Sequence, residues 1–233
     1  MFGDQTRRPA PDSAPGPARD TARGTARASG RDPAPGPGAT SARERILDAA
    51  TRLFAGLGYD GTSTRMIADA AGLNIATVAY HVGGKRDLYL AVMERAHRAE
   101  QGVVDAALAD FTPDRDGVRR LVDRYLDFCV EHPEIPALWM HRWLSDAADV
   151  VHLEGSYVKP LLAKVGEAVR QAAGDDVDVE YAVMTVIWTT HGFCRGGVLD
   201  ADGRRTGLDD PKQVARFRAH LHRLVLGMLD LPR

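Results

Sequence analysis

The sequence predicts an all-α protein of about nine helices. From residue 41 onward, apolar residues recur at intervals of three and four along most of the chain, which is the period of an amphipathic helix. A sustained alternation of apolar and polar residues, the pattern of a half-buried strand, does not occur. Residues that begin or end helices separate the periodic segments, so we expect helices without a sheet.

Length and composition restrict the class of protein. The chain has 233 residues, of which 44% are hydrophobic and 27% charged, a mixture typical of globular proteins with one or two domains. Its apolar runs are far shorter than the roughly 20 residues that a membrane helix needs, so we expect no membrane association. Two cysteines, Cys129 and Cys194, are too few for a disulfide framework or a four-cysteine zinc site. Because the N-terminus also lacks the apolar core of a secretory signal, we expect a cytoplasmic, reduced protein.

Residues 1–40 differ from the rest of the chain. They hold seven of the 13 prolines and six glycines, with Met1 and Phe2 as the only large apolar residues. Such a segment buries too little apolar surface to offset its ordering entropy, so we expect a disordered tail. Its six arginines outnumber its four aspartates and could contact DNA, although a solvated tail is the favoured interpretation.

Capping residues and apolar periodicity locate the helices of the remaining chain. Ser41 followed by Glu44 has the spacing of a capping box, and Asn74 can cap a helix that begins at Ile75. The Gly- and Asp-rich segment from Gly196 to Asp210 is expected to be a mobile loop. The expected helices lie at about residues 42–57, 64–71, 75–82, 85–109, 118–129, 135–144, 157–169, 179–195 and 212–229.

Residues 64–82 have the spacing of a helix-turn-helix. Two short helices can cross steeply if their contact point is small and the turn between them adopts a positive φ. Ala68 provides the small contact, Gly72 the turn and Val78 the apolar residue that packs from the second helix. This spacing is that of DNA-binding helix-turn-helix units, but Ala-rich helical hairpins show it too.

The surrounding residues resemble one family. From Ile46 to Leu88, the residues that carry the resemblance are Ala49-Ala50, Leu53-Phe54, Gly58-Tyr59, Thr62, Ile67-Ala68, Ala71-Gly72, Tyr80-His81 and Lys85. At these positions the chain closely resembles the N-terminal domain of the TetR family of transcriptional repressors. The resemblance implies a three-helix DNA-binding domain at residues 41–88, a connecting helix, and a helical ligand-binding and dimerisation domain at residues 89–233. The C-terminal part matches only in length and helical content.

Ten residues of this region are expected to contact DNA. Hydroxyls and free amides at a helix start can hold a phosphate, and the resemblance places further phosphate contacts on the third helix and at the start of the fourth. Base contacts are expected from the exposed N-terminal side of the third helix and from an arginine before it, since arginine pairs with guanine in the major groove. The expected residues are Ser63, Thr64, Arg65, Asn74, Ile75, Ala76, Thr77, Tyr80, His81 and Lys85.

Several of these residues have structural alternatives. Tyr80 could fill the core, His81 could be merely solvated, and Arg65 could pair with Asp69 four residues later. Ala79 departs from the family, in which an aromatic residue is frequent at this position. Gly84 stands where the family usually has a serine or a similar cap, and glycine is itself an acceptable N-cap residue.

The C-terminal helices carry candidate ligand and dimer contacts. Small-molecule sites combine apolar walls with a few polar groups, although aromatic residues at helical spacing also form ordinary cores. Helices 179–195 and 212–229 have three-four apolar seams that could form a four-helix bundle with a second copy, or face their own core. The candidate ligand contacts are Tyr125, Phe128, Cys129, Trp139, Trp143, Tyr157, Trp188 and His191.

The sequence therefore predicts a ligand-responsive transcriptional regulator, favoured as a repressor. Its expected partners are a palindromic double-stranded DNA operator, a second copy of the chain and an unidentified small-molecule effector, which would place it at the nucleoid. No cofactor, metal site or enzyme activity is expected, because phosphate-binding glycine loops and the His-Glu-x-x-His motif are absent. The alternative is a helical small-molecule or metal sensor that no longer binds DNA. The charge of only +1 over residues 41–97 slightly favours that alternative.

Overall fold

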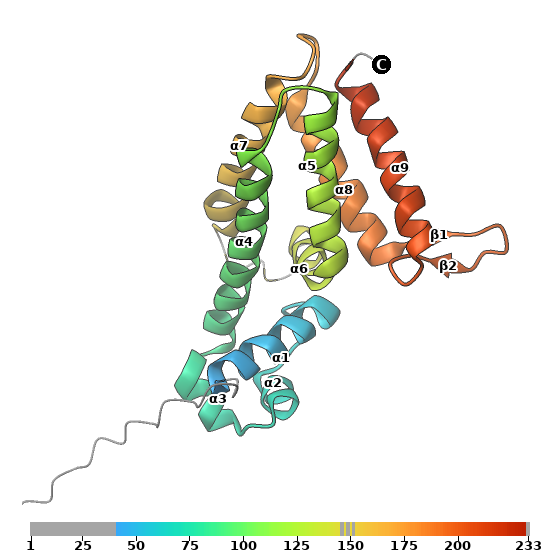
Figure 1. Cartoon of the computed structure of the whole chain (residues 1–233). Coiled ribbons are helices and arrows are strands. Elements are labelled where there is room, and N and C mark those ends of the chain that lie inside the picture. Colours follow the sequence, from blue (N-terminus) through green and yellow to red (C-terminus); the bar gives the residue numbers. More distant parts are fainter. Residues whose placement is uncertain (1–40, 145–146, 148–149, 151, 232–233) are drawn as a thin grey trace, which may run out of the picture. The chain divides into compact units, whose positions relative to one another are not determined.

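The computed structural model describes residues 41–144, 147, 150 and 152–231. The tail expected at residues 1–40 lies outside the described residues. Those described belong to one compact unit, Ala39–Arg233, and they form nine α-helices, a short π-helix and one two-stranded hairpin (Figure 1). The prediction of an all-α protein of about nine helices is confirmed. No helix among them is long and apolar enough to cross a membrane.

The elements follow one another closely, and each predicted helix is present. In chain order they are α1 (Ala42–Leu57), α2 (Thr64–Ala71), α3 (Ile75–Val82), α4 (Lys85–Ala109), α5 (Arg115–Glu131), α6 (Glu134–Trp143), the π-helix η1 (Glu154–Val158), α7 (Lys159–Arg170), α8 (Val179–Gly196), β1 (Val198–Leu199), β2 (Arg205–Thr206) and α9 (Pro211–Met228). The helix ends agree with the sequence to within a few residues because local caps and glycines determine them.

The prediction of no sheet was wrong in one place. Between α8 and α9, where we expected a loop, β1 and β2 pair antiparallel, with Val198 opposite Thr206. Asp200 closes the turn, since its Oδ1 accepts hydrogen bonds from the amides of Asp202 at 3.0 Å and Arg204 at 2.8 Å. Each strand has only two residues, which is too short for the alternating pattern of a strand to be recognised.

The helix-turn-helix forms as predicted. The side chains of Ser63 and Asn74 cap α2 and α3, each accepting a hydrogen bond from the amide three residues later. Gly72 ends α2 in the left-handed conformation, with φ 65° and ψ 39°, which residues with a Cβ adopt at a cost. Ala68 and Val78 are both buried where the two helices meet. The small contact, the turn and the apolar side chain therefore have the roles that their spacing indicated.

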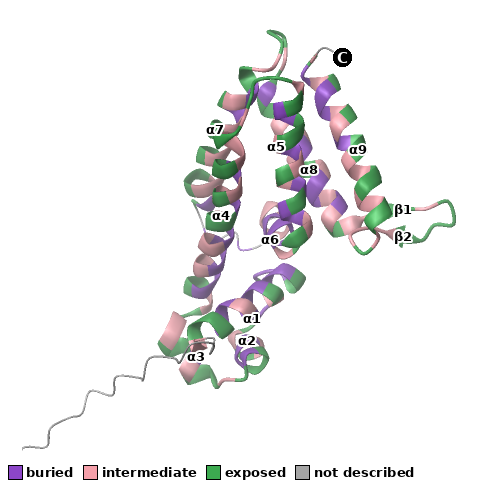
Figure 2. Cartoon of the chain, in the orientation of Figure 1, coloured by how far each residue is buried: buried purple, intermediate pink, exposed green. Residues whose placement is uncertain are grey.

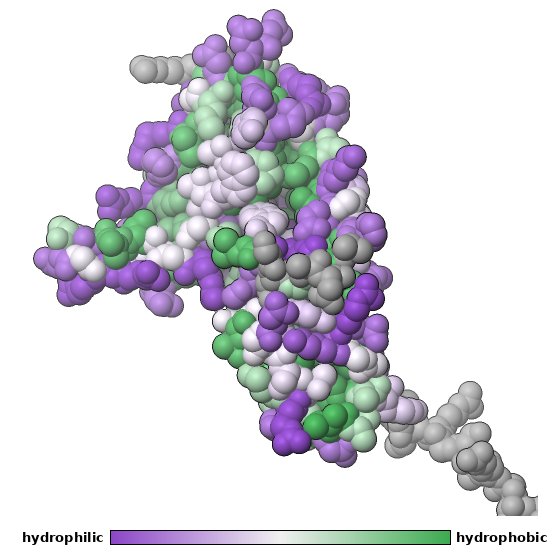
Figure 3. Space-filling view, turned by 180° about the vertical axis from the view of Figure 1, so that it is seen from behind, coloured by the Kyte–Doolittle hydropathy of each residue, from purple (hydrophilic) through white to green (hydrophobic). Residues whose placement is uncertain are grey.

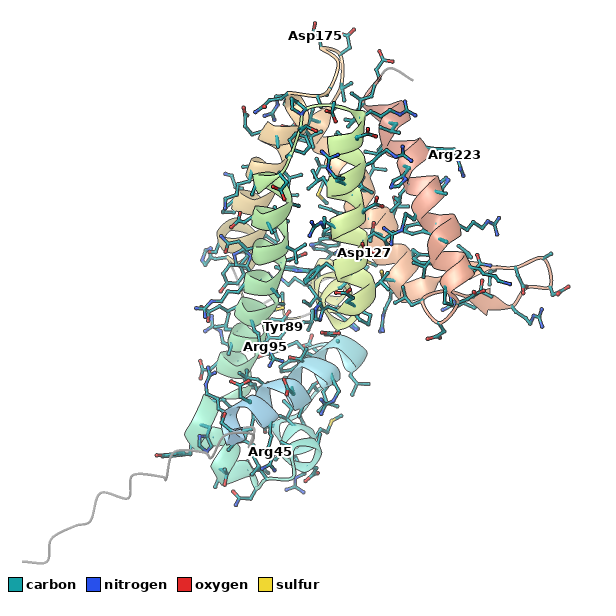
Figure 4. All side chains as sticks on the ribbon, in the orientation of Figure 1. Arg45, Tyr89, Arg95, Asp127, Asp175 and Arg223 are labelled. Atoms are coloured by element: carbon teal, nitrogen blue, oxygen red, sulfur yellow. The ribbon has the colours of Figure 1, made fainter. Side chains whose placement is uncertain are left out.

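Helix α4 packs against α1 and also against α5 and α7. The guanidinium of Arg95 on α4 donates hydrogen bonds to the Asp48 carboxylate at 2.7 Å, the Thr51 hydroxyl at 2.6 Å and the Leu47 carbonyl at 3.2 Å, all on α1 (Figure 4). The domain boundary expected at residues 88–89 falls inside this continuous helix, and it stays a prediction.

Two clusters of buried side chains make up the core among the described residues. Figure 2 shows the buried residues along the helices. The first cluster contains residues of the four helices α1, α2, α3 and α4, together with Phe128 of α5 and residues of α6 such as Trp139. The second joins α5, α7, α8 and α9. Helix α6 also contacts α1 directly, because a ring nitrogen of His141 lies 3.2 Å from the Ala55 carbonyl oxygen. The first three helices thus share their core with α4 and α6.

Candidate functional sites

Helix α3 buries one side and exposes the other. Of its residues, Val78 is buried, whereas Ile75, Ala76 and Ala79 are exposed and the Tyr80 side chain is 81% exposed. Exposure of this aromatic side chain excludes the alternative that Tyr80 fills the core. An exposed short helix after a tight turn is the arrangement in which a recognition helix enters the major groove.

None of the ten predicted DNA contacts is buried. Six are exposed and four are partly exposed, and all lie between the start of α2 and the start of α4. No ion pair joins Arg65 to Asp69 in the described part of the chain, so the arginine side chain remains available for a base or a phosphate. That these residues contact DNA stays a prediction. The exposed ones are Ser63, Arg65, Asn74, Ile75, Ala76 and Tyr80, and the partly exposed ones are Thr64, Thr77, His81 and Lys85.

Four of the ten also have structural roles, and one of them is Ser63, which caps α2. The Asn74 carboxamide oxygen accepts hydrogen bonds from the amide of Thr77 at 2.7 Å and from its hydroxyl at 3.0 Å. The ammonium of Lys85 lies 4.2 Å from the centroid of the Tyr59 ring, a cation–π contact worth about 0.5–1 kcal/mol at an exposed site. These contacts hold the starts of α3 and α4, and hence the predicted DNA-contacting residues, in defined positions.

A cavity lies among the C-terminal helices. It has a volume of about 100 Å³ and is lined by side chains of α4, α5, α6, η1, α7, α8 and α9. Most lining residues are aliphatic, such as Val118, Leu161 and Ile187, and four are aromatic. Small-molecule sites have walls of this kind, mostly apolar with a few polar groups.

The structure brings five of the eight candidate ligand contacts to the cavity wall. The other three lie elsewhere: Phe128 and Cys129 are buried outside the lining, and Trp188 is 48% exposed. A ligand role for any of the eight stays a prediction. The five lining residues are Tyr125, Trp139, Trp143, Tyr157 and His191.

Glu100 on α4 is the one carboxylate among the described lining residues. Glu100 is only 8% exposed, and its Oε2 accepts a hydrogen bond of 3.1 Å from the indole Nε1 of Trp139. Burial raises the pKa of Glu100 to about 7, and the indole hydrogen bond opposes this shift only in part. The group therefore ionises near neutral pH inside an apolar wall.

Two histidines also line the cavity. The Nε2 of His191 lies 2.7 Å from the Tyr125 hydroxyl, and its ring stacks on Trp143 with a centroid separation of 5.2 Å. Burial lowers the pKa of His191 to about 4. The ring of His97 stacks on Tyr157 at 4.5 Å, and burial lowers its pKa as well. Both rings are consequently neutral near neutral pH, and the Nδ1 of each is buried without a hydrogen-bond partner among the described residues.

Sequence reasoning missed Glu100 and His97. A signal for Glu100 was present, because Ala96, Glu100 and Val104 recur every four residues and all three are buried on one side of α4. A carboxylate at a core position of an amphipathic helix is rare unless it is paired. The polar residues around it, from Glu94 to Gln101, obscured this position.

The cysteines do not form a metal site with their neighbours. Cys129 and Cys194 are free thiols, and the Sγ of Cys194 lies 3.8 Å from the Cys129 carbonyl oxygen. Within residues 41–144, 147, 150 and 152–231, no group of three or more His, Cys, Asp or Glu side chains is placed to hold a metal ion.

The apolar seams of α8 and α9 pack into the core of their own chain. One buried cluster contains Val179 and Val186 of α8 and Leu221 and Val225 of α9. These residues therefore follow the alternative in which the seams face the core of their own chain. Apolar residues of α8 are nevertheless exposed outside this cluster, including Tyr181 and Trp188. On the face opposite to that of Figure 1, weakly polar and apolar residues gather between hydrophilic ones (Figure 3).

These features define a class of protein, in which a helix-turn-helix unit is joined by a long helix to a helical domain with an apolar cavity. Residues 46–92 match the family model described as bacterial regulatory proteins, tetR family. The N-terminal part of the chain thus matches the DNA-binding domain of this family.

Known transcriptional activators and repressors are similar to the N-terminal part of the chain. It is 34% identical over 90 residues to the HTH-type transcriptional activator FasR of Mycolicibacterium smegmatis, covering 39% of this chain and 41% of FasR. It is 35% identical over 78 residues to the HTH-type transcriptional repressor AcnR of Corynebacterium glutamicum, covering 33% of this chain and 42% of AcnR. The chain thus spans about two fifths of the length of these relatives.

A solved structure extends the likeness to the whole fold. The crystal structure of AibR in complex with isovaleryl coenzyme A and operator DNA superimposes with a TM-score of 0.58 and 19% identity, over 78% of this chain and 98% of that chain. At this identity the likeness shows a common fold, which here includes the C-terminal helices.

Proposed function

We propose that this protein is a transcriptional repressor that binds a palindromic operator as a homodimer and is released by a small molecule. The observation that carries the proposal is the exposed outer side of α3, with Tyr80 81% exposed, in a domain that matches the TetR family. The relatives include an activator and a repressor. Whether binding represses or activates transcription depends on where the operator lies relative to the promoter. An enzyme is not supported, because the family is one of regulatory proteins.

DNA binding would place α3 in the major groove. The residues at the starts of α2 and α4 would then lie against the phosphates on either side, because a recognition helix is flanked by backbone contacts. Two such helices in a two-fold dimer read half-sites about 34–36 Å apart, so binding is sensitive to a small change in their separation.

Two helices connect the cavity with α1. Helix α4 carries Glu100 at the cavity and Arg95 at α1, and α6 carries Trp139 at the cavity and His141 at α1. A ligand that separated α4 from α6 would therefore move residues bound to α1. This supports α4 as the element that transmits ligand binding to the DNA-binding helices, with α6 as a second connection.

The dimer contact is proposed on the outward side of α8, together with α9. Tyr181 and Trp188 expose aromatic surface there, and aromatic residues are enriched at protein interfaces. Because the inward seams are used within the chain, this outward side is the surface of the two helices that a second copy can cover.

The test is selection of genomic DNA fragments by the purified full chain at two salt concentrations, followed by sequencing. A palindromic consensus whose retention falls steeply with salt is expected, since each phosphate contact releases counterions. The absence of enrichment at low salt would overturn the proposal in favour of a helical sensor that does not bind DNA. The weak charge of residues 41–97 favours that second candidate.

Matched variants test the DNA contacts. Tyr80→Ala and Lys85→Ala are expected to lower operator affinity by about tenfold each, as loss of about 1–2 kcal/mol predicts. Tyr80→Ala should leave stability unchanged because the side chain is exposed, whereas Lys85→Ala also loses the contact with Tyr59. Lys159→Ala removes an exposed charge at the start of α7 and serves as the control, with unchanged affinity for the operator.

A further inference from the structure

The wall of the cavity has a distinctive charge pattern. Glu100 supplies a carboxylate, and the two histidines are neutral near neutral pH because burial lowers the pKa of each. Neither lysine nor arginine occurs among the described residues that line the cavity.

Cations near this region already have partners. On α6, the Nε of Arg142 donates to the Glu154 carboxylate at 2.6 Å. On α7, the Nζ of Lys164 donates to the Asp105 carboxylate at 2.8 Å. In the described structure, the indole of Trp139 is the one hydrogen-bond donor that reaches Glu100. The carboxylate is thus buried without a counter-charge among the described residues, an arrangement that is unfavourable for the ionised form unless a partner arrives.

Aromatic rings surround the same cavity. Tyr125, Trp139, Trp143 and Tyr157 all line it. The faces of such rings attract cations, and aromatic cages of this kind recognise alkylated ammonium groups. Aliphatic residues of α5, α7 and α8 form the rest of the wall, and they suit the apolar part of a ligand.

We propose that the effector of this protein is an apolar amine, whose ammonium group pairs with Glu100 and whose hydrocarbon part fills the aliphatic side of the cavity. The inference rests on the proposed function, because it assigns the chemical class of the proposed effector. Pairing supplies the missing counter-charge and a second donor to the carboxylate. A carboxylic acid or an acyl thioester of coenzyme A would bring negative charge instead, and the described lining offers no cation to receive it. AibR, which has a similar fold, was solved with isovaleryl coenzyme A. The proposal therefore assigns this chain a different class of ligand from the one in that structure.

The test uses three probes with the same chain and different head groups. Octylamine, 1-octanol and octanoate are titrated into the full-length protein near neutral pH, and binding is measured by isothermal titration calorimetry. Octylamine is expected to bind about tenfold more tightly than 1-octanol, a difference typical of a desolvated ammonium against a carboxylate and aromatic rings, and octanoate is expected to bind most weakly. If 1-octanol or octanoate binds as tightly as octylamine, or if no probe binds, the proposal is overturned.

A variant assigns the preference to the carboxylate. Glu100→Gln is expected to reduce the preference for octylamine over 1-octanol to less than about twofold, with the affinity for 1-octanol little changed. Retained 1-octanol binding shows that the variant cavity is intact. Glu94→Gln, which changes a partly exposed carboxylate on the same helix that is paired with Arg98, is the control and should keep the preference. A preference that survives in Glu100→Gln would overturn the proposal.

A separate measurement distinguishes this proposal from the proposed function. The binding of a selected operator fragment is measured with and without octylamine. Release of the fragment by octylamine, and not by octanoate, supports both. If octylamine binds in a Glu100-dependent manner but the fragment is never bound, the ligand class stands and the regulatory function fails. If the fragment is bound but octanoate releases it better than octylamine does, the function stands and the ligand class is overturned.

Discussion

Replacing Glu100 by glutamine should change how the stability of the protein depends on pH. Burial raises the pKa of this carboxyl from 4.5 to about 7 in the folded chain. Between these values the folded state keeps a proton that the unfolded chain has released. The free energy of unfolding therefore falls as the pH rises from about 4.5 to about 7, and the loss is complete above that range.

The size of the effect follows from the two pKa values. At 1.36 kcal/mol per pH unit, the separation between 4.5 and about 7 corresponds to about 3 kcal/mol. Glutamine cannot ionise, has nearly the same size, and can still accept the hydrogen bond from Trp139. The variant should consequently lack this loss and gain stability relative to the original chain as the pH rises.

Urea unfolding of both proteins from about pH 5 to about pH 8.5 measures the effect. The difference in the free energy of unfolding should increase by about 2–3 kcal/mol over this range in favour of the variant. His191 contributes the opposite slope, because burial lowers its pKa from 6.5 to about 4 and stability is lost as the pH falls, but this contribution is common to both proteins and cancels in the difference.

The control is Glu131→Gln, which alters an exposed carboxylate on α5. Its difference from the original chain should stay within about 0.5 kcal/mol at every pH. A Glu100→Gln difference that is equally flat would refute the argument, because it would mean that the carboxylate is solvated in the folded protein.

Three further changes have measurable outcomes. Gly72→Ala places a Cβ at a φ of 65° and should lower the free energy of unfolding by about 1–2 kcal/mol. Gly56→Ala lies within α1, with nothing near its added Cβ, and should raise the free energy of unfolding by up to about 1 kcal/mol. Equal urea midpoints for the two variants would contradict this prediction. Trp188→Ala should weaken self-association at least about tenfold in sedimentation equilibrium without altering helix content, and an unchanged association constant would remove α8 from the dimer contact. Burial raises the pKa of the Cys194 thiol to about 11 and that of Cys129 further, so iodoacetamide at about pH 8 should label both slowly until the protein is unfolded.

Local signals in the sequence determined the helices and the helix-turn-helix. Ser63, Asn74 and Gly72 act within a few residues of their own position, through a cap hydrogen bond or a positive φ, and Val78 is buried where its spacing from Ala68 placed it. Because these effects depend on neighbours along the chain, the sequence by itself is enough to assign them. The same reasoning found five aromatic or polar residues of the cavity wall, since large side chains on apolar helices tend to lie inside.

Only the tertiary structure decided which of these side chains share a cavity and which face outward. Trp188 and Trp143 look alike in the sequence, but one is exposed on α8 and the other stacks on His191. The seams of α8 and α9 could have faced a second copy or their own core, and packing against α5 and α7 directs them inward. Glu100 gains its raised pKa from burial among the residues that other helices bring to the cavity wall. Burial and pairing depend on contacts between distant parts of the chain, which periodicity along one helix does not specify.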